Sequence, residues 1–378
     1  MRLTVLNVAY PLAPVGPDAV GGAEQVLTQL DYALVQAGHN SLVIACEGSK
    51  TAGTLIPTPR SNGKLTAQSR QTAQERHRAA IEQALRDHPV DLIHMHGIDF
   101  DGYLPPPGLP VLVTLHLPPA WYPAEIFQLA RPLTWLHCVS RAQRLSCPAS
   151  PLLLPEIENG VSCERFAGPH AKRRYALALG RICPEKGFHI ALDAATRADW
   201  PLWLGGEVFG YEAHERYHRE EILPRLNGRH RFLGPLGARR KQRLLGGAGC
   251  LLAPSLAPET SSLVAMEALA SGTPVIAFAS GALAEIVEDG RTGFLVKSEA
   301  EMAEAIRAAA QLDSETCRAS ARRRFSAERM ITEYLERYQA LAQVGHLRER
   351  PNCSSRRGRL TFRHKTGSEP IHIGCYDI

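Results

Sequence analysis

A segment at positions 258–276 places two glutamates on either side of a predicted helix start. It follows an apolar strand over 250–253, and the helix begins near Ser262. Hydroxyl side chains before the helix can cap its first turn, and its unpaired N–H groups can bind a phosphate. Glu267 interrupts an apolar helix, so its carboxylate requires a polar partner. The pattern indicates a site for a phosphorylated sugar at Glu259 and Glu267, unless the two are an ordinary loop acid and a helix surface acid.

Glycines and histidines follow predicted strands in the first half of the chain. Gly21 and Gly22 open a helix after the first strand, where glycines let a backbone approach a ligand closely. A plain helix-start turn is the alternative. His116 ends the apolar run VLVTLH, where a capping role is the alternative, and His96 and Ser140 occupy similar strand-end positions. Ligands bind at such strand ends in parallel sheets, so these residues are candidates for a second part of the site.

Metal and disulfide chemistry is not indicated by the sequence. His94 and His96 would lie on one face of a strand, but no acids or cysteines cluster beside them. The nine cysteines are spread singly and none has CxxC spacing. We therefore expect no metal, no disulfide framework and mostly buried thiols.

Short apolar runs alternate with amphipathic helices along the chain, and the pattern restarts after residue 174. This alternation predicts doubly wound parallel sheets, here two Rossmann-like domains facing across a cleft. Strands are expected at 3–9, 41–46, 90–94, 111–115, 134–139, 175–180, 201–204, 231–233, 250–253 and 274–278. The expected organisation is a first domain over 1–166, a linker over 167–174, a second domain over 175–326, a helix over 327–345 that crosses back to the first domain, and a poorly ordered basic tail over 346–378.

Composition excludes several classes of protein. The 378 residues are 44% hydrophobic and 21% charged, which is typical of a globular protein and not of a disordered one. Most of the net charge of +5 lies in residues 346–378, so the nearly neutral remainder is unlike a nucleic-acid-binding domain. No apolar run reaches the length of a membrane span and no signal peptide is evident, so we expect a cytoplasmic protein that can also contact the inner membrane face.

Several motifs together resemble the retaining glycosyltransferases of family four, which have the GT-B fold with a glycogen-synthase-like donor domain. The resemblance covers about residues 1–344. It is carried by the glutamate segment with its LVAMEALASGTPVIA and by four further motifs: GGAEQVLTQLDYALVQAGH at 21–39, IENGVSCERF at 157–166, LGRICPEKGFHIALDA at 179–194 and GALAEIVEDGRTGFLV at 281–296.

The resemblance implies a nucleotide-sugar donor site in the second domain. Glu267 would bind the ribose hydroxyls, and Glu259 would lie by the transferred sugar, where positive charge develops. The backbone of Ser262 and Leu263 would hold the distal phosphate. The resemblance also implies that Arg181 and Lys186 neutralise the diphosphate. The loop with Gly21 and Gly22 would lie beside the diphosphate, and His116 would contact the donor sugar.

The implied reaction is metal-independent, retaining transfer of a hexosyl group to a hydroxyl of a glycan, lipid or small metabolite, with no cofactor. The segment 260–262, Thr-Ser-Ser, differs from the glycine-rich or aromatic residues usual in the family, which leaves the donor sugar open. A nicotinamide-dependent oxidoreductase is one alternative, because Glu47 ends the second strand, although the loop lacks GxGxxG. A catalytically silent protein of the same fold is the other.

Overall fold

The computed structural model describes the chain except residues 20, 61–65, 169, 349–360, 363–370 and 373–378. It consists of two compact units. The first comprises Met1–Val139, Arg144–Ile157 and the described residues from Ile331 on, and the second comprises Ser140–Gln143 and Glu158–Met330. The chain thus passes between units at 139/140, 143/144, 157/158 and 330/331. The sequence analysis placed the end of the first domain at 166, a linker over 167–174 and the end of the second domain at 326.

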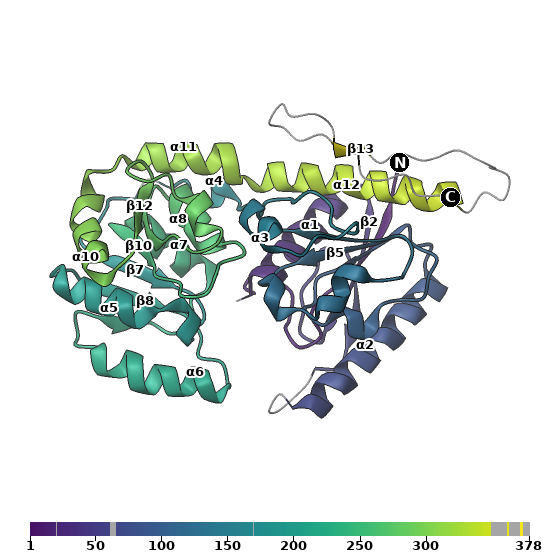
Figure 1. Ribbon diagram of the computed structural model, residues 1–378, viewed down its shortest axis with the longest axis horizontal. Helices are drawn as coiled ribbons and strands as arrows, with labels where there is room; N and C mark the ends of the chain where they lie inside the picture. Colours follow the sequence, from purple (N-terminus) through teal and green to yellow (C-terminus); the bar gives the residue numbers. More distant parts are fainter. Residues whose placement is uncertain (20, 61–65, 169, 349–360, 363–370, 373–378) are drawn as a thin grey trace. The chain divides into compact units, whose positions relative to one another are not determined.

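The first unit is built on a six-stranded parallel sheet with the order β3-β2-β1-β4-β5-β6. Most of its strand residues are buried at successive positions, because helices cover both faces of the sheet (Figure 1). The strands are β1 (Thr4–Val8), β2 (Asn40–Cys46), β3 (Thr54–Thr58), β4 (Leu92–Met95), β5 (Val111–Leu115) and β6 (Thr134–Cys138). The α-helices are α1 (Gly22–Gln36), α2 (Ala67–Asp87), α3 (Arg141–Ser146), whose first residues belong to the second unit, and α12 (Ala327–Arg348).

The second unit repeats this architecture with the strand order β12-β11-β10-β7-β8-β9, again all parallel. Helix α5 packs with α10, and α8 packs with α7 and α11. The strands are β7 (Ala176–Leu179), β8 (Leu202–Gly205), β9 (Arg231–Phe232), β10 (Cys250–Ala253), β11 (Val275–Phe278) and β12 (Gly293–Val296). The α-helices are α4 (Cys163–Phe166), α5 (Phe188–Arg197), α6 (Glu212–Tyr217), α7 (Ala238–Gly247), α8 (Leu263–Ala270), α9 (Leu283–Ile286), α10 (Glu299–Ala308) and α11 (Ser314–Phe325).

The same winding in both sheets fixes where a ligand would bind. Strand order reverses between β1 and β4 in the first unit and between β7 and β10 in the second. Open α/β sheets bind ligands beyond the carboxyl ends of the strands at such a switch point. The loops after these four strands are therefore the places to look for a site.

The doubly wound α/β fold predicted from the sequence is confirmed, and every predicted strand is present. The sequence analysis missed β3 and β12, which are both edge strands. β3 is only partly buried and contains Pro57, so it lacks the continuous apolar run of a central strand. Helix α6 ends at Tyr217 and continues as a π-helical turn over His218–Ile222 and a 3-10 turn over Leu223–Arg225, which contains Pro224.

The C-terminal helix α12 extends to Arg348, three residues past its expected end. Most of the predicted basic tail lies outside the described residues, except for the short strands β13 (Thr361–Phe362) and β14 (Ile371–His372), which pair antiparallel. Among the described residues, no helix is long and apolar enough to cross a membrane.

A buried polar network joins α12 to the sheet of the first unit. Tyr338 Oη lies 2.7 Å from His94 Nδ1, and His94 Nε2 lies 2.6 Å from Thr114 Oγ1. The same hydroxyl lies 2.7 Å from His137 Nε2 and 3.3 Å from Tyr334 Oη. Burial lowers the pKa of His94 and His137 well below the usual 6.5, with the charge of Arg337 adding to the effect at His137. Both imidazoles are therefore neutral in the folded chain.

We expect the first unit to lose stability as the pH falls below about 6.5. The unfolded chain binds protons at these histidines from that pH downward and the folded chain does not, so the free energy of unfolding decreases by up to about 1.4 kcal/mol per pH unit for each histidine. Hydrogen exchange at β4–β6 between pH 7.5 and 5 measures this slope. His94→Gln should shift the whole curve of unfolding free energy against pH, and its slope should lose the contribution of one histidine. An unchanged slope in that variant would contradict the explanation.

Candidate functional site

Glu259 lies in the loop after β10, at the switch point of the second unit, and a cation from the neighbouring loop binds it. Lys186 Nζ, in the loop after β7, donates a hydrogen bond to Glu259 Oε1 at 2.5 Å. The Ser255 hydroxyl donates to the same oxygen. Both charged side chains are mostly buried, with 23% of Lys186 and 12% of Glu259 exposed. A pair this protected from water is stronger than an exposed one, and it fixes the carboxylate at the carboxyl end of the sheet.

A glycine that the sequence analysis did not single out supports the Glu259 backbone. Gly281 follows β11 with φ +57°, and a Cβ there would lie 2.2 Å from the Glu259 carbonyl oxygen. Ala282 N–H donates to that oxygen at 2.7 Å. Only glycine meets both conditions without strain. The signal was present in the motif at 281–296, but no sequence spacing relates Gly281 to Glu259.

Glu267 is buried in helix α8 with only one of its two carboxylate oxygens paired. Lys241 Nζ, from α7, donates to Glu267 Oε1 at 2.6 Å. The other oxygen, Oε2, is buried and has no hydrogen-bond partner among the described residues. Burial raises the pKa of Glu267, and the charge and hydrogen bond of Lys241 oppose that rise. A buried carboxylate oxygen without a partner is costly, so this oxygen is suited to accept a hydrogen bond from a ligand.

The start of α8 combines a cap with a second buried oxygen that lacks a partner. Ser262 is the N-cap, and its hydroxyl accepts a hydrogen bond from Ala265 N–H at 3.4 Å. Leu263 is the first helical residue, as expected within one position. The Ser261 hydroxyl oxygen is buried and has no partner among the described residues. The turn therefore offers a helix N-terminus and a hydroxyl to an anion.

Arg181 and Lys186, predicted together as cations for a diphosphate, differ in their surroundings. Lys186 binds Glu259, whereas the Arg181 side chain has no hydrogen-bonded or ion-paired partner in the described part of the chain. Arg181 is thus the cation of this loop that a phosphate can engage without breaking an existing pair. Lys186 can serve a phosphate only while it also serves Glu259.

Three side chains near this loop could serve as ligands for a metal ion. Single ligand atoms of Cys183, Glu185 and His214 lie within 4.8 Å of one another, and no other such group occurs in the described ranges. Glu185 is exposed, and burial, together with the positive charge of Arg181, lowers the pKa of His214. Of the histidines considered for metal in the sequence, His94 has both ring nitrogens bonded to protein hydroxyls, which leaves it no ligand atom.

The first unit brings two of its predicted residues together at the corresponding edge. His96 follows β4 and His116 follows β5, and His96 Nδ1 shares a hydrogen bond with His116 Nε2 at 3.0 Å. Burial lowers the pKa of His116 to about 3, so at neutral pH one ring donates and the other accepts. The backbone N–H of His116 donates to Tyr122 Oη at 3.0 Å, a partner that the sequence did not indicate.

The remaining predicted residues, Gly21 and Gly22 of the first unit and Ser140 of the second, have structural contacts. Gly21 is the N-cap of α1, and a Cβ there would clash with the carboxylate of Glu24 in the first turn. Gly22 begins the helix. The Ser140 hydroxyl accepts a hydrogen bond from Gln143 N–H at 3.1 Å, so it caps α3.

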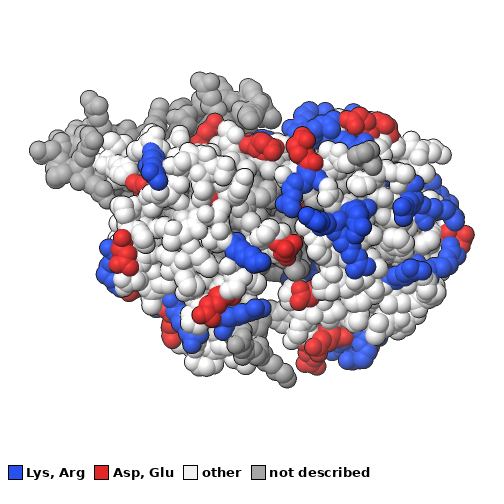
Figure 2. Space-filling model, turned by 180° about the vertical axis from the view of Figure 1, so that it is seen from behind, with Lys and Arg blue, Asp and Glu red and all other residues white. Residues whose placement is uncertain are grey.

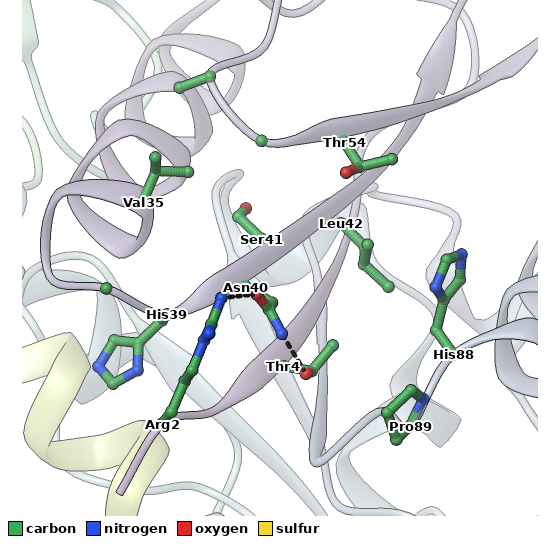
Figure 3. Close-up of a pocket in the computed structure, with 13 residues that line it drawn as sticks. Arg2, Thr4, Val35, His39, Asn40, Ser41, Leu42, Thr54, His88 and Pro89 are labelled. Carbon is green, nitrogen blue, oxygen red and sulfur yellow. Dashed lines mark hydrogen bonds between the residues drawn. The ribbon is translucent and has the colours of Figure 1, made fainter.

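A hollow of about 590 Å³ lies at the opposite edge of the first sheet (Figure 3). Thr4, Asn40 and Thr54, the first residues of their strands, contribute to its lining. Arg2 donates to Asn40 Oδ1 at 2.7 Å, and Asn40 donates to Thr4 at 3.1 Å. Because it lies at the amino ends of the strands, this hollow is separate from the switch-point residues.

Lys and Arg side chains gather on the second unit with Asp and Glu among them (Figure 2). Glu288 alone forms ion pairs with Arg291, Arg323 and Arg324. Such pairing compensates much of the positive charge, as expected for the nearly neutral body of the chain.

Comparison with known proteins gives the family. Residues 173–311 match the model described as "Glycosyl transferases group 1", and residues 20–152 match "Glycosyltransferase Family 4". Together the two matches cover well over half of the chain, one in each half. The chain belongs to glycosyltransferase family 4. The family predicted from the sequence motifs is thereby confirmed. This family assignment argues against the alternative of a nicotinamide-dependent oxidoreductase.

Similar proteins and solved structures are also glycosyltransferases. A phosphatidyl-myo-inositol mannosyltransferase of Mycobacterium leprae is 25% identical over 372 residues, which span 88% of this chain and 97% of that protein. A D-inositol 3-phosphate glycosyltransferase of Streptomyces scabiei is 44% identical, but over 39% of this chain and 38% of that protein. The structure of a glycosyltransferase involved in avilamycin A biosynthesis matches with a TM-score of 0.67 and 26% identity over 91% of this chain and 99% of its own. Sucrose-phosphate synthase from Thermosynechococcus elongatus, with a TM-score of 0.73 and 19% identity over 91% of this chain and 100% of its own, shows the same GT-B fold.

Proposed function

We propose that this glycosyltransferase moves a hexosyl group from a nucleoside diphosphate sugar to a hydroxyl acceptor with retention of configuration. The observation that carries the proposal is Glu267, a buried carboxylate with one oxygen paired to Lys241 and the other without a partner. A ribose offers a hydroxyl donor to such an oxygen. The nearby start of α8 and the unpaired Arg181 suit the diphosphate.

Glu259 is proposed to face the transferred sugar. As the bond from the anomeric carbon to the phosphate oxygen breaks, the sugar gains positive charge and the diphosphate gains negative charge. The Glu259 carboxylate, fixed by Lys186 and Ser255, stabilises the positive charge on the sugar. Arg181 and the N-terminus of α8 stabilise the negative charge on the diphosphate. Because Glu259 is held by Lys186 and Ser255 before the reaction, its carboxylate needs little reorganisation at the transition state.

Two comparisons support the donor and the acceptor class. A structural neighbour, Anabaena HepE, has been solved in complex with UDP-glucose, with a TM-score of 0.67 and 20% identity to this chain. The mycobacterial and streptomycete relatives act, by their names, on inositol-type compounds. We propose a cyclic polyol or its lipid-linked form as the acceptor, and a place of action in the cytoplasm or at the inner membrane face.

A panel of nucleotide sugars tests the proposal. We expect the purified chain to hydrolyse one donor slowly without acceptor, and an inositol-type acceptor to speed nucleotide release. Proton NMR of the product then reads the anomeric configuration, which should match that of the donor. A chain that binds nucleotide but consumes no donor under any of these conditions would be a catalytically silent member of the family.

We also expect the activity to survive chelation of metal ions. The proposed leaving-group stabilisation uses Arg181 and the start of α8, and no pair of aspartates faces them in the described residues. Donor turnover with excess EDTA should stay within about twofold of the untreated rate. Loss of turnover that Mg²⁺ or Mn²⁺ restores would show instead that a metal ion binds the diphosphate and stabilises it as it leaves.

A further inference from the structure

Two cysteines of the first unit lie in contact at the end of its sheet. Cys138 is the last residue of β6, and Cys147 follows α3. Their sulfur atoms are 3.4 Å apart and share a hydrogen bond. Cys138 is fully buried, whereas Cys147 is partly exposed. This pair was not predictable from sequence spacing, because the two thiols are nine positions apart and have no CxxC spacing.

The contact brings the two sulfurs close to bonding distance. A disulfide bond is about 2.05 Å long, so a shift of little more than 1 Å, shared between two side chains, would close it. The eight residues between the two cysteines include one short helix, α3. The geometry therefore permits a disulfide within this segment.

The surroundings give the two thiols different roles. The hydrogen bond shared with Cys138 lowers the pKa of Cys147 against the effect of burial, and the charge of Arg144 adds to the lowering. The same contact and burial raise the pKa of Cys138. Arg144 is held in place by an ion pair with Glu156 at 2.5 Å. Cys147 is therefore the accessible nucleophile, and Cys138 is the buried thiol that follows it.

We propose that Cys138 and Cys147 form a thiol–disulfide exchange site whose substrate is a low-molecular-weight disulfide such as oxidised glutathione. The Cys147 thiolate attacks one sulfur of the small disulfide, breaks its S–S bond and releases one thiolate. Cys138 then attacks the Cys147 sulfur, releases the second thiolate and passes its proton to it. The chain loses two electrons and two protons overall, and the small disulfide becomes two thiols.

Equilibration of the full chain in glutathione buffers tests this site. The ratio of oxidised to reduced glutathione is varied, the reaction is stopped with acid, and free thiols are alkylated after denaturation and mapped by mass spectrometry. We expect two of the nine cysteines to become protected as one cross-link between Cys138 and Cys147, reversed by dithiothreitol. This readout does not involve glycosyl transfer, so it stands or fails independently of the proposed function.

Variants separate the two steps. Cys138→Ser should stop the reaction at a glutathione adduct on Cys147, whereas Cys147→Ser should abolish both the adduct and the cross-link. Cys163→Ser, which removes a buried thiol in the second unit, is the matched control and should behave as the wild type. Full alkylation of Cys138 and Cys147 in the most oxidising buffer, or a cross-link from Cys147 to another cysteine, would overturn the proposal, and the wild-type chain alone suffices to show either.

Discussion

Replacing Glu259 with glutamine is expected to lower turnover by on the order of a hundredfold, while the affinity for the nucleoside diphosphate stays within a few-fold of wild type. Glutamine keeps the shape of the side chain and can still accept a hydrogen bond from Ser255. It removes the negative charge, which matters most when the sugar becomes positively charged. An interaction that strengthens in the transition state affects the rate more than the binding of substrate.

The loss of the ion pair with Lys186 needs its own control. In Glu259→Gln, Lys186 loses its carboxylate partner and could bind the diphosphate more tightly, which would lower turnover by stabilising the bound donor. Lys186→Met alone and together with Glu259→Gln forms a double-mutant cycle that separates this effect. Equal losses of affinity and turnover in Glu259→Gln would place Glu259 in the binding of substrate rather than in the chemical step. An inverted product would contradict the proposed stereochemistry even if turnover fell as expected.

The fold was predictable because it rests on local patterns. Short continuous apolar runs rich in β-branched residues, such as Val111–Leu115, favour strands buried on both faces, and each is followed by a chain segment long enough to cross over and return parallel. The positions of Glu259, Ser262 and Glu267 follow from the same reasoning, because a loop and a helix start must come after β10. The edge strand β3 escaped prediction since a strand with one neighbour needs fewer apolar residues.

The partners within the site could not be predicted in this way. Lys241 and Glu267 are 26 positions apart, and Lys186 and Glu259 are 73 apart. No periodicity relates residues on different βα units, so their pairing depends on how the units pack. The Tyr338 contact to His94 likewise spans 244 positions. Sequence reasoning therefore proposed Glu259, Glu267 and Lys186 as site residues, but it did not predict the pairing of Lys186 with Glu259 and it did not single out Lys241.

The second large expected effect is a loss of nucleotide affinity when Glu267, the ion-pair partner of Lys241, is replaced. Glu267→Ala should weaken binding of the nucleoside diphosphate and of the whole nucleotide sugar equally, because the ribose is common to both. A hydrogen bond to a charged group contributes about 1.5–3 kcal/mol, which corresponds to roughly ten- to a hundredfold in affinity. Isothermal titration calorimetry measures both ligands. Glu304→Ala, which removes an exposed glutamate of the same unit, is the control and should bind as the wild type.

Lys241→Met should produce a loss of affinity that depends on pH, although Lys241 itself is not proposed to touch the ribose. Burial raises the pKa of Glu267, and the positive charge of Lys241 opposes this rise. Without it the carboxyl group binds a proton at higher pH, and a protonated carboxyl is a poorer hydrogen-bond acceptor than a carboxylate. The affinity of Lys241→Met should therefore be closest to wild type at high pH and fall progressively as the pH is lowered, whereas Lys241→Arg, which keeps the charge, should show the shallow wild-type profile. A loss of affinity in Lys241→Met that is the same from pH 6 to pH 9 would mean that Lys241 acts through packing or direct contact, and not through the charge of Glu267.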